Sequence, residues 1–143
     1  MIINPAAGFR ADPVGRAVLV GQHRAMTTVL IVDDHAGFRA QARALLEADG
    51  FTVIGEATNG TSSLETVRTL RPDLVLLDIG LPDVEGFEVA RELAVTGPPP
   101  RVVLTWSREA SEYGPRLTSS RALGFIPKDE LSGAAIRALV RLA

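Results

Sequence analysis

Five short apolar segments alternate with stretches of helical periodicity, and this alternation constrains the fold more than any other feature. The segments are rich in valine, leucine and isoleucine, which is typical of strands buried on both faces of a sheet. The predicted strands are residues 28–32, 52–57, 74–77, 102–105 and 123–127. Apolar residues three and four positions apart predict helices over residues 38–48, 61–70, 85–94 and 131–142, and a weaker helix is expected over residues 111–120.

Strands joined by helical crossovers predict a parallel sheet, because a crossover returns the chain to the same edge. We therefore expect an α/β protein with a flavodoxin-like, doubly wound (βα)5 fold: five parallel strands with helices on both faces. Asn59-Gly60 is predicted to be a turn, with Thr61 capping the helix that follows. Gly114-Pro115 interrupts the helix predicted over residues 111–120, which we expect to be short.

The first 25 residues differ from the rest, with several glycines and prolines around one apolar patch, residues 18–20. We expect residues 1–25 to be a loosely ordered extension and residues 26–143 to be a single domain. The patch at residues 18–20 is alternatively a short strand or helical turn that docks on the domain.

Composition excludes several classes of protein. A chain of 143 residues with 46% hydrophobic and 22% charged residues is that of an ordinary globular domain. The net charge of -2 gives no field that attracts nucleic acid or an anionic membrane, and the absence of cysteine excludes disulfides and thiolate chemistry. Apolar runs are too short to span a membrane, and no secretory signal is recognisable, so we expect a cytoplasmic protein.

Polar residues follow four of the five predicted strands. Asp33 and Asp34 end the first strand, Asp78 the third, Thr105 the fourth, and Lys128 follows the fifth. Because ligands of open parallel sheets bind at the carboxyl ends of the strands, we expect these side chains to converge on one edge.

The predicted set has a chemical logic. Carboxylates held close together repel one another, and a divalent cation relieves that repulsion. Ligands that are all oxygen atoms favour Mg²⁺, which readily shares its shell with a phosphoryl group. Asp78 is then a candidate nucleophile that forms an aspartyl phosphate, Lys128 neutralises charge on the transferred group, and Thr105 donates a hydrogen bond to it.

Four segments of the chain resemble the receiver domains of bacterial response regulators. They are VLIVDDH at residues 29–35, LLDIGLPDVEGFE at 76–88, VVLT at 102–105 and GFIPK at 124–128. Each is a weak signal alone, but together they stand in the order of the family, each at the end of a predicted strand. The resemblance covers roughly residues 27–142.

The resemblance implies a role for each matched residue at the metal site. Asp34 is expected to be a direct Mg²⁺ ligand and Asp33 to hold metal-bound water. Asp78 is expected to be both ligand and phosphoacceptor, and the backbone carbonyl of Gly80 to complete the set of protein ligands.

It also implies a switch and its partners. Thr105 and Lys128 are expected to bind the phosphoryl group, and Phe125 to be a core aromatic that turns inward when Thr105 moves. The expected donor is a sensor histidine kinase or phosphotransfer protein. The expected output surface, formed by residues 111–120, 123–127 and 131–142, binds a downstream protein or a second copy of the chain.

Several positions depart from the usual pattern. Phe125 replaces the commoner tyrosine, Pro127 precedes the lysine, and Trp106 stands where a small residue is usual, either as packing or as a lid over Asp78. Asp129 after the lysine resembles receivers of the branch with a LuxR-type output. His35 lacks a second nitrogen or sulfur ligand at metal-binding spacing, which favours a solvated first-turn histidine.

Other functions remain open. A receiver-like module that binds or dimerises without phosphorylation is the main alternative, although the retained acids argue against it. A haloacid-dehalogenase type of hydrolase needs a second aspartate where this chain has Gly80. We expect no turnover of a metabolite and no direct contact with nucleic acid. The chain is expected to be a stand-alone receiver or a fragment of a longer regulator.

Overall fold

A five-stranded parallel sheet forms the centre of the protein. The computed structural model describes residues 9–11, 17–19, 27–107 and 121–142. The strands of the central sheet are β3 (Thr28–Val32), β4 (Thr52–Ala57), β5 (Leu74–Asp78), β6 (Arg101–Trp106) and β7 (Gly124–Pro127). They lie in the order β4-β3-β5-β6-β7, and every pair is parallel. The predicted five-stranded parallel sheet is therefore confirmed.

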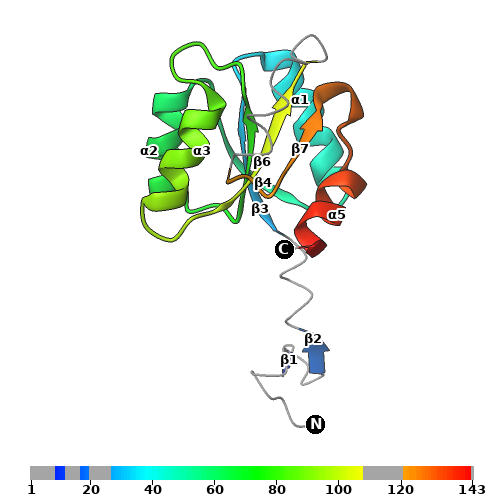
Figure 1. The fold of residues 1–143 in the computed structure, drawn as a ribbon. Coiled ribbons are helices and arrows are strands. Elements are labelled where there is room, and N and C mark those ends of the chain that lie inside the picture. The colour runs from blue at the N-terminus through cyan, green and yellow to red at the C-terminus, as the bar shows by residue number, and fades with distance from the viewer. Residues whose placement is uncertain (1–8, 12–16, 20–26, 108–120, 143) are drawn as a thin grey trace.

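Helices cover both faces of this sheet. They are α1 (Ala36–Ala48), α2 (Gly60–Leu70), α3 (Gly86–Val95) and α5 (Gly133–Leu142). Helices α2 and α3 lie on one face, and α1 and α5 lie on the other (Figure 1). Each face has its own apolar core, so the doubly wound arrangement is also confirmed. The helix predicted over residues 111–120 lies outside the described residues.

Strand β5 runs through the middle of the sheet, and all five of its residues are buried. Its valine and leucine side chains alternate between the two cores, with Val75 and Leu77 in one and Leu74 and Leu76 in the other. A strand packed on both faces has little freedom to shift. Asp78, its last residue, is therefore held on a rigid element.

The start of α2 differs from the prediction. Asn59 is the N-cap: its side chain accepts a hydrogen bond of 2.8 Å from the Ser62 N–H. Thr61 lies one residue inside the helix, and its hydroxyl donates to Asp83 at 2.7 Å instead. The prediction that Thr61 caps this helix is therefore wrong, because a tertiary acceptor is available to its hydroxyl. Helix α5 begins two residues later than predicted, after a short 3-10 turn over Lys128–Glu130.

The N-terminal part contains a second, separate sheet. Strands β1 (Phe9–Ala11) and β2 (Ala17–Leu19) pair antiparallel and are not part of the five-stranded sheet. The apolar patch thus contributes to a short strand, as one alternative predicted, but this strand pairs with β1 and docking on the domain stays a prediction. The rest of the extension lies outside the described residues, and its boundary at residue 25 stays a prediction. Among the described helices, none has both the length and the apolar character that crossing a bilayer requires.

We predict that Asn59→Ala lowers the free energy of unfolding by about 1 kcal/mol, because the Ser62 N–H loses its acceptor. Urea denaturation measures the change. Thr58→Ala is the matched control, since Thr58 is exposed and precedes the cap. Equal losses in the two variants would contradict the assignment of Asn59 as the cap.

Candidate functional site

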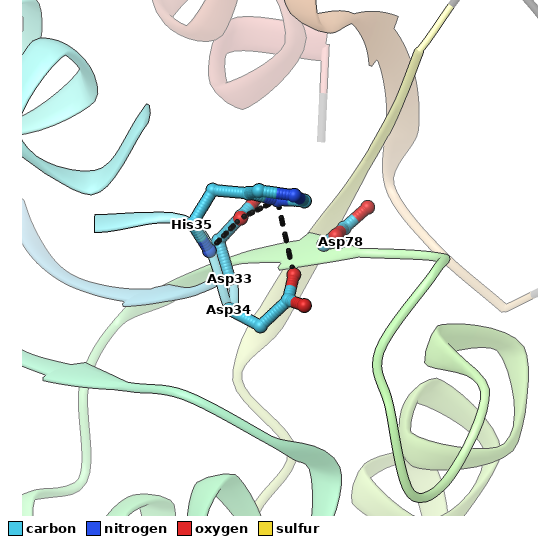
Figure 2. Close-up of side chains that lie close together, drawn as sticks. All are labelled: Asp33, Asp34, His35 and Asp78. Carbon is cyan, nitrogen blue, oxygen red and sulfur yellow. Dashed lines mark hydrogen bonds and ion pairs between the residues drawn. The ribbon is translucent and has the colours of Figure 1, made fainter. Parts of the chain in front are cut away.

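The sheet register brings the predicted residues to one edge. Val32 of β3 pairs with Leu77 of β5, so the residues that follow them, Asp33 and Asp78, lie at neighbouring strand ends. Asp78 is directly in register with Thr105 of β6. Figure 2 shows Asp33, Asp34 and Asp78 gathered with His35, and one ligand atom from each lies within 4.8 Å of the others.

Lys128 brings a positive charge to two carboxylates of this cluster. Its Nζ lies 2.7 Å from Asp33 Oδ2 and 3.4 Å from Asp78 Oδ2. It also lies 4.7 Å from the centre of the Phe38 ring, over its face. Asp33 is fully buried and Asp78 is 4% exposed, so neither carboxylate is well hydrated. One ammonium group thus partly compensates two buried negative charges.

The environment of Asp78 disfavours its negative charge. Burial raises the pKa of the Asp78 carboxyl, and the charge of Asp33 raises it further. Lys128 and the Gly80 N–H, which donates to Asp78 Oδ1 at 3.2 Å, oppose these effects without overcoming them. A further positive charge that enters the site would therefore stabilise the Asp78 carboxylate.

Thr105 carries a buried hydroxyl that is available for a ligand. The residue is 1% exposed, and its Oγ1 has no hydrogen-bond partner within the described part of the chain. A buried hydroxyl without a partner is costly and usually marks a site that a ligand or water completes. Because Thr105 stands beside Asp78 in the sheet, an acceptor bound to Asp78 is well placed to satisfy it.

His35 occupies the N-cap position of α1, and its side chain is 69% exposed, in agreement with a solvated first-turn histidine. Its backbone N–H donates to Asp33 Oδ1 at 2.8 Å. The ring Nδ1 lies 3.2 Å from Asp33 Oδ1 and 3.1 Å from Asp34 Oδ1. The contact between the ring and both acids was not predicted from the sequence, since it depends on how the turn after β3 folds.

Phe125 does not lie in the core, so this prediction is wrong. The side chain is 42% exposed, because β7 is an edge strand and its alternation buries Ile126 instead. The Phe125 ring contacts the Trp106 ring, with centroids 5.8 Å apart and planes at 53°. Trp106 is half-buried and packs against the core on the α2 and α3 side. Trp106 therefore packs and also contacts Phe125, and its role as a lid over Asp78 stays a prediction.

Two residues that shape the loop after Asp78 were missed as functional candidates. Asp83 accepts hydrogen bonds from the Gly60 N–H at 2.7 Å and the Thr61 N–H at 3.0 Å, besides the Thr61 hydroxyl. These donors hold the pKa of the Asp83 carboxyl well below its usual range. At Gly86, a Cβ would overlap the Asp78 carbonyl oxygen. No local sequence pattern predicts either role, because both depend on contacts between separate segments.

A cavity of about 1050 Å³ lies elsewhere, at the amino-terminal ends of the strands. Thr27, Asp73 and Arg101, which line it, precede or begin β3, β5 and β6. The acidic cluster follows the other ends of these strands. None of the predicted site residues therefore lines this cavity.

The chain matches the response regulator receiver domain family over residues 29–141. The protein therefore belongs to this family of signalling domains, as its fold and acidic site indicate. The signal receiver domain of the response regulator NarL from Mycobacterium tuberculosis is a similar solved structure. It has a TM-score of 0.71 and 30% identity, over 81% of this chain and 94% of that one.

Curated relatives are transcription regulators and response regulators. BvgA of Bordetella pertussis, a positive transcription regulator of virulence factors, is 43% identical over 102 residues, which are 71% of this chain and 49% of BvgA. The response regulator GacA of Pseudomonas viridiflava is 38% identical over 104 residues, 72% of this chain and 49% of GacA. The chain thus spans about half the length of these relatives. A LuxR-family response regulator from Aurantimonas has the same fold, with a TM-score of 0.72 and 24% identity over 82% of this chain and 84% of that one.

We predict opposite effects of one chemical change at two aspartates. In magnesium-free buffer at pH 7, Asp78→Asn raises the Tm by a few degrees, because it removes a buried charge whose pKa is raised. Asp83→Asn lowers the Tm, because a carboxylate with a lowered pKa stabilises the fold at every pH above its unfolded-state value.

Thermal unfolding from pH 7 downward checks both effects. The advantage of Asp78→Asn shrinks as the pH falls toward the raised pKa, since the wild-type carboxyl then takes up a proton. A gain that stays constant down to the most acidic pH at which the protein folds would contradict the assigned cause.

Proposed function

We propose that the protein is a phosphorylation switch of a two-component system, with Asp78 as the phosphoacceptor. The observation that carries this proposal is the geometry around Asp78. Lys128 Nζ lies 3.4 Å from one carboxylate oxygen, and Thr105, with a buried hydroxyl that lacks a partner in the described structure, is its neighbour in the sheet. An acid, an ammonium and an orphan hydroxyl together suit a phosphoryl group.

The acidic cluster fits a magnesium ion. Lys128 contacts two of its three carboxylates, the buried Asp33 and Asp78, which leaves net negative charge at this end of the sheet. We propose that Asp34 and Asp78 bind the ion directly, that Asp33 holds a metal-bound water, and that the Gly80 carbonyl is a further ligand. When bound, Mg²⁺ supplies positive charge to the carboxylates and to the transferred phosphoryl group.

In the proposed transfer, an Asp78 carboxylate oxygen forms a bond to phosphorus as the P–N bond of a phosphohistidine breaks. The electron pair of that bond returns to the imidazole nitrogen, which then takes up a proton. Lys128 binds a phosphoryl oxygen, and the Thr105 hydroxyl donates to another, which satisfies its buried hydrogen. Asp78 is consumed in each transfer, so no metabolite is turned over.

The output step would involve Phe125. Its half-exposed ring lies on the edge strand, against Trp106, and has no place in either core. We propose that movement of Thr105 toward the phosphoryl group opens space into which Phe125 turns. The surface of residues 121–142, including β7 and α5, would change shape and bind a downstream partner or a second copy of the chain.

The partners are proposals as well. The donor would be a sensor histidine kinase or phosphotransfer protein, and the location cytoplasmic. Since curated relatives are about twice as long and are named as regulators of transcription or response regulators, an output domain in a longer protein is one route to an effect. A stand-alone receiver acting through protein contacts is the other. The proposal includes no direct contact between these residues and nucleic acid.

We predict that wild type gains one phosphoryl group when incubated with acetyl phosphate and Mg²⁺, and that Asp78→Asn gains none. Intact-protein mass spectrometry measures the shift. Asp129→Asn is the matched control, because it makes the same substitution next to Lys128. It is expected to keep the gain, because Asp129 is exposed. A mass shift that survives Asp78→Asn would contradict the acceptor assignment. No shift in wild type that binds Mg²⁺ would favour a phosphorylation-independent binding module.

A further inference from the structure

The backbone of Asp33 is held from both sides. Its N–H donates to the Ala57 carbonyl of β4 at 3.0 Å. Its carbonyl oxygen accepts a hydrogen bond of 2.8 Å from Arg39 Nη1, a side chain of the first turns of α1. The peptide unit between Asp33 and Asp34 is therefore fixed by a charged donor and not only by the sheet.

Arg39 is itself held by Glu56. Its Nε donates to Glu56 Oε1 at 2.9 Å, and Arg43, one turn further along α1, donates through Nε to Glu56 Oε2 at 2.9 Å. The Arg39 side chain is 16% exposed and that of Glu56 is 30% exposed. Both arginines thus dock α1 on β4 through one carboxylate, but only Arg39 also bonds to Asp33.

The orientation of Asp34 depends on this peptide unit. Asp34 is exposed, and within the described structure its side chain contacts the ring of His35, which is still more exposed, at 3.1 Å. The His35 ring also contacts the buried Asp33 carboxylate, at 3.2 Å, and both of these contacts lie within the turn itself. The direction in which the Asp34 carboxylate leaves the chain is therefore set by the backbone of the turn between β3 and α1.

We propose that Arg39 is a positioning residue that fixes this turn so that Asp34 and Asp33 face Asp78. The proposal deepens the proposed function and rests on it where it concerns magnesium. Arg39 touches no carboxylate of the cluster, so it acts through the Asp33 carbonyl. A guanidinium suits this task because its planar fork donates to Glu56 and to the carbonyl at once, which a single ammonium in the same place does not reproduce.

Arg39→Lys and Arg43→Lys form a matched pair that leaves the net charge unchanged. Isothermal titration with Mg²⁺ alone is expected to give about a tenfold weaker affinity for Arg39→Lys, the usual cost of losing a group that orients metal ligands. Arg43→Lys is expected to bind as wild type does, because Arg43 makes no bond to Asp33. Equal affinity of the two variants, with wild type binding magnesium, would overturn the role of Arg39.

Arg39→Gln separates positioning from charge. Loss of a positive charge near the cluster strengthens cation binding if electrostatics alone decides the affinity. Loss of positioning weakens it, so the two accounts predict opposite signs. We expect weaker binding, and tighter binding in Arg39→Gln would overturn the proposal.

Hydrogen exchange of the magnesium-free protein tests the same inference without the metal. The His35 N–H, which donates to Asp33 Oδ1 at 2.8 Å, is expected to exchange faster than wild type in Arg39→Lys and at the wild-type rate in Arg43→Lys. Equal rates in both variants would overturn the positioning role. If wild type fails to bind Mg²⁺ while the exchange rates differ as expected, the magnesium part of the proposed function fails and the positioning of the turn stands.

Discussion

The contact of Lys128 with two buried carboxylates is the constraint on which the site depends. Asp33 and Asp78 approach the same ammonium group, at 2.7 and 3.4 Å, in an environment almost closed to solvent. Burial raises the pKa of Asp78, and the charge of Asp33 raises it further, which Lys128 offsets only in part. The parallel sheet creates this situation because it brings the ends of β3 and β5 side by side.

The surrounding elements divide into those that fix Asp78 and those that are free to respond. Strand β5 is buried along its whole length, Gly86 lets α3 begin against the Asp78 backbone, and Asp83 ties the following loop to α2. By contrast, β7 is an edge strand, and Phe125 on it is half-exposed. In the proposed switch, a change at Asp78 would therefore act through Thr105 and β7 more readily than by movement of β5.

Much of the fold and the placement of the candidate site residues could be predicted from the sequence, because apolar periodicity and strand-end position are local properties. Asp33, Asp78, Thr105 and Lys128 were expected at one edge and lie there. The failures concern tertiary contacts: a distant acceptor drew Thr61 away from capping, and the edge position of β7 exposed Phe125. The hydrogen bond from Arg39 to the Asp33 carbonyl could not be predicted either, since no sequence pattern indicates the direction of a long side chain.

A structure of the protein with Mg²⁺ and beryllium trifluoride, a mimic of the phosphoryl group, tests the central claim most directly. The account predicts that the mimic binds an Asp78 carboxylate oxygen. Lys128 Nζ and Thr105 Oγ1 would each donate a hydrogen bond to a fluorine, and Lys128 would move away from Asp33. A mimic bound to another carboxylate, or bound to Asp78 while Thr105 Oγ1 stays without a partner, would contradict it.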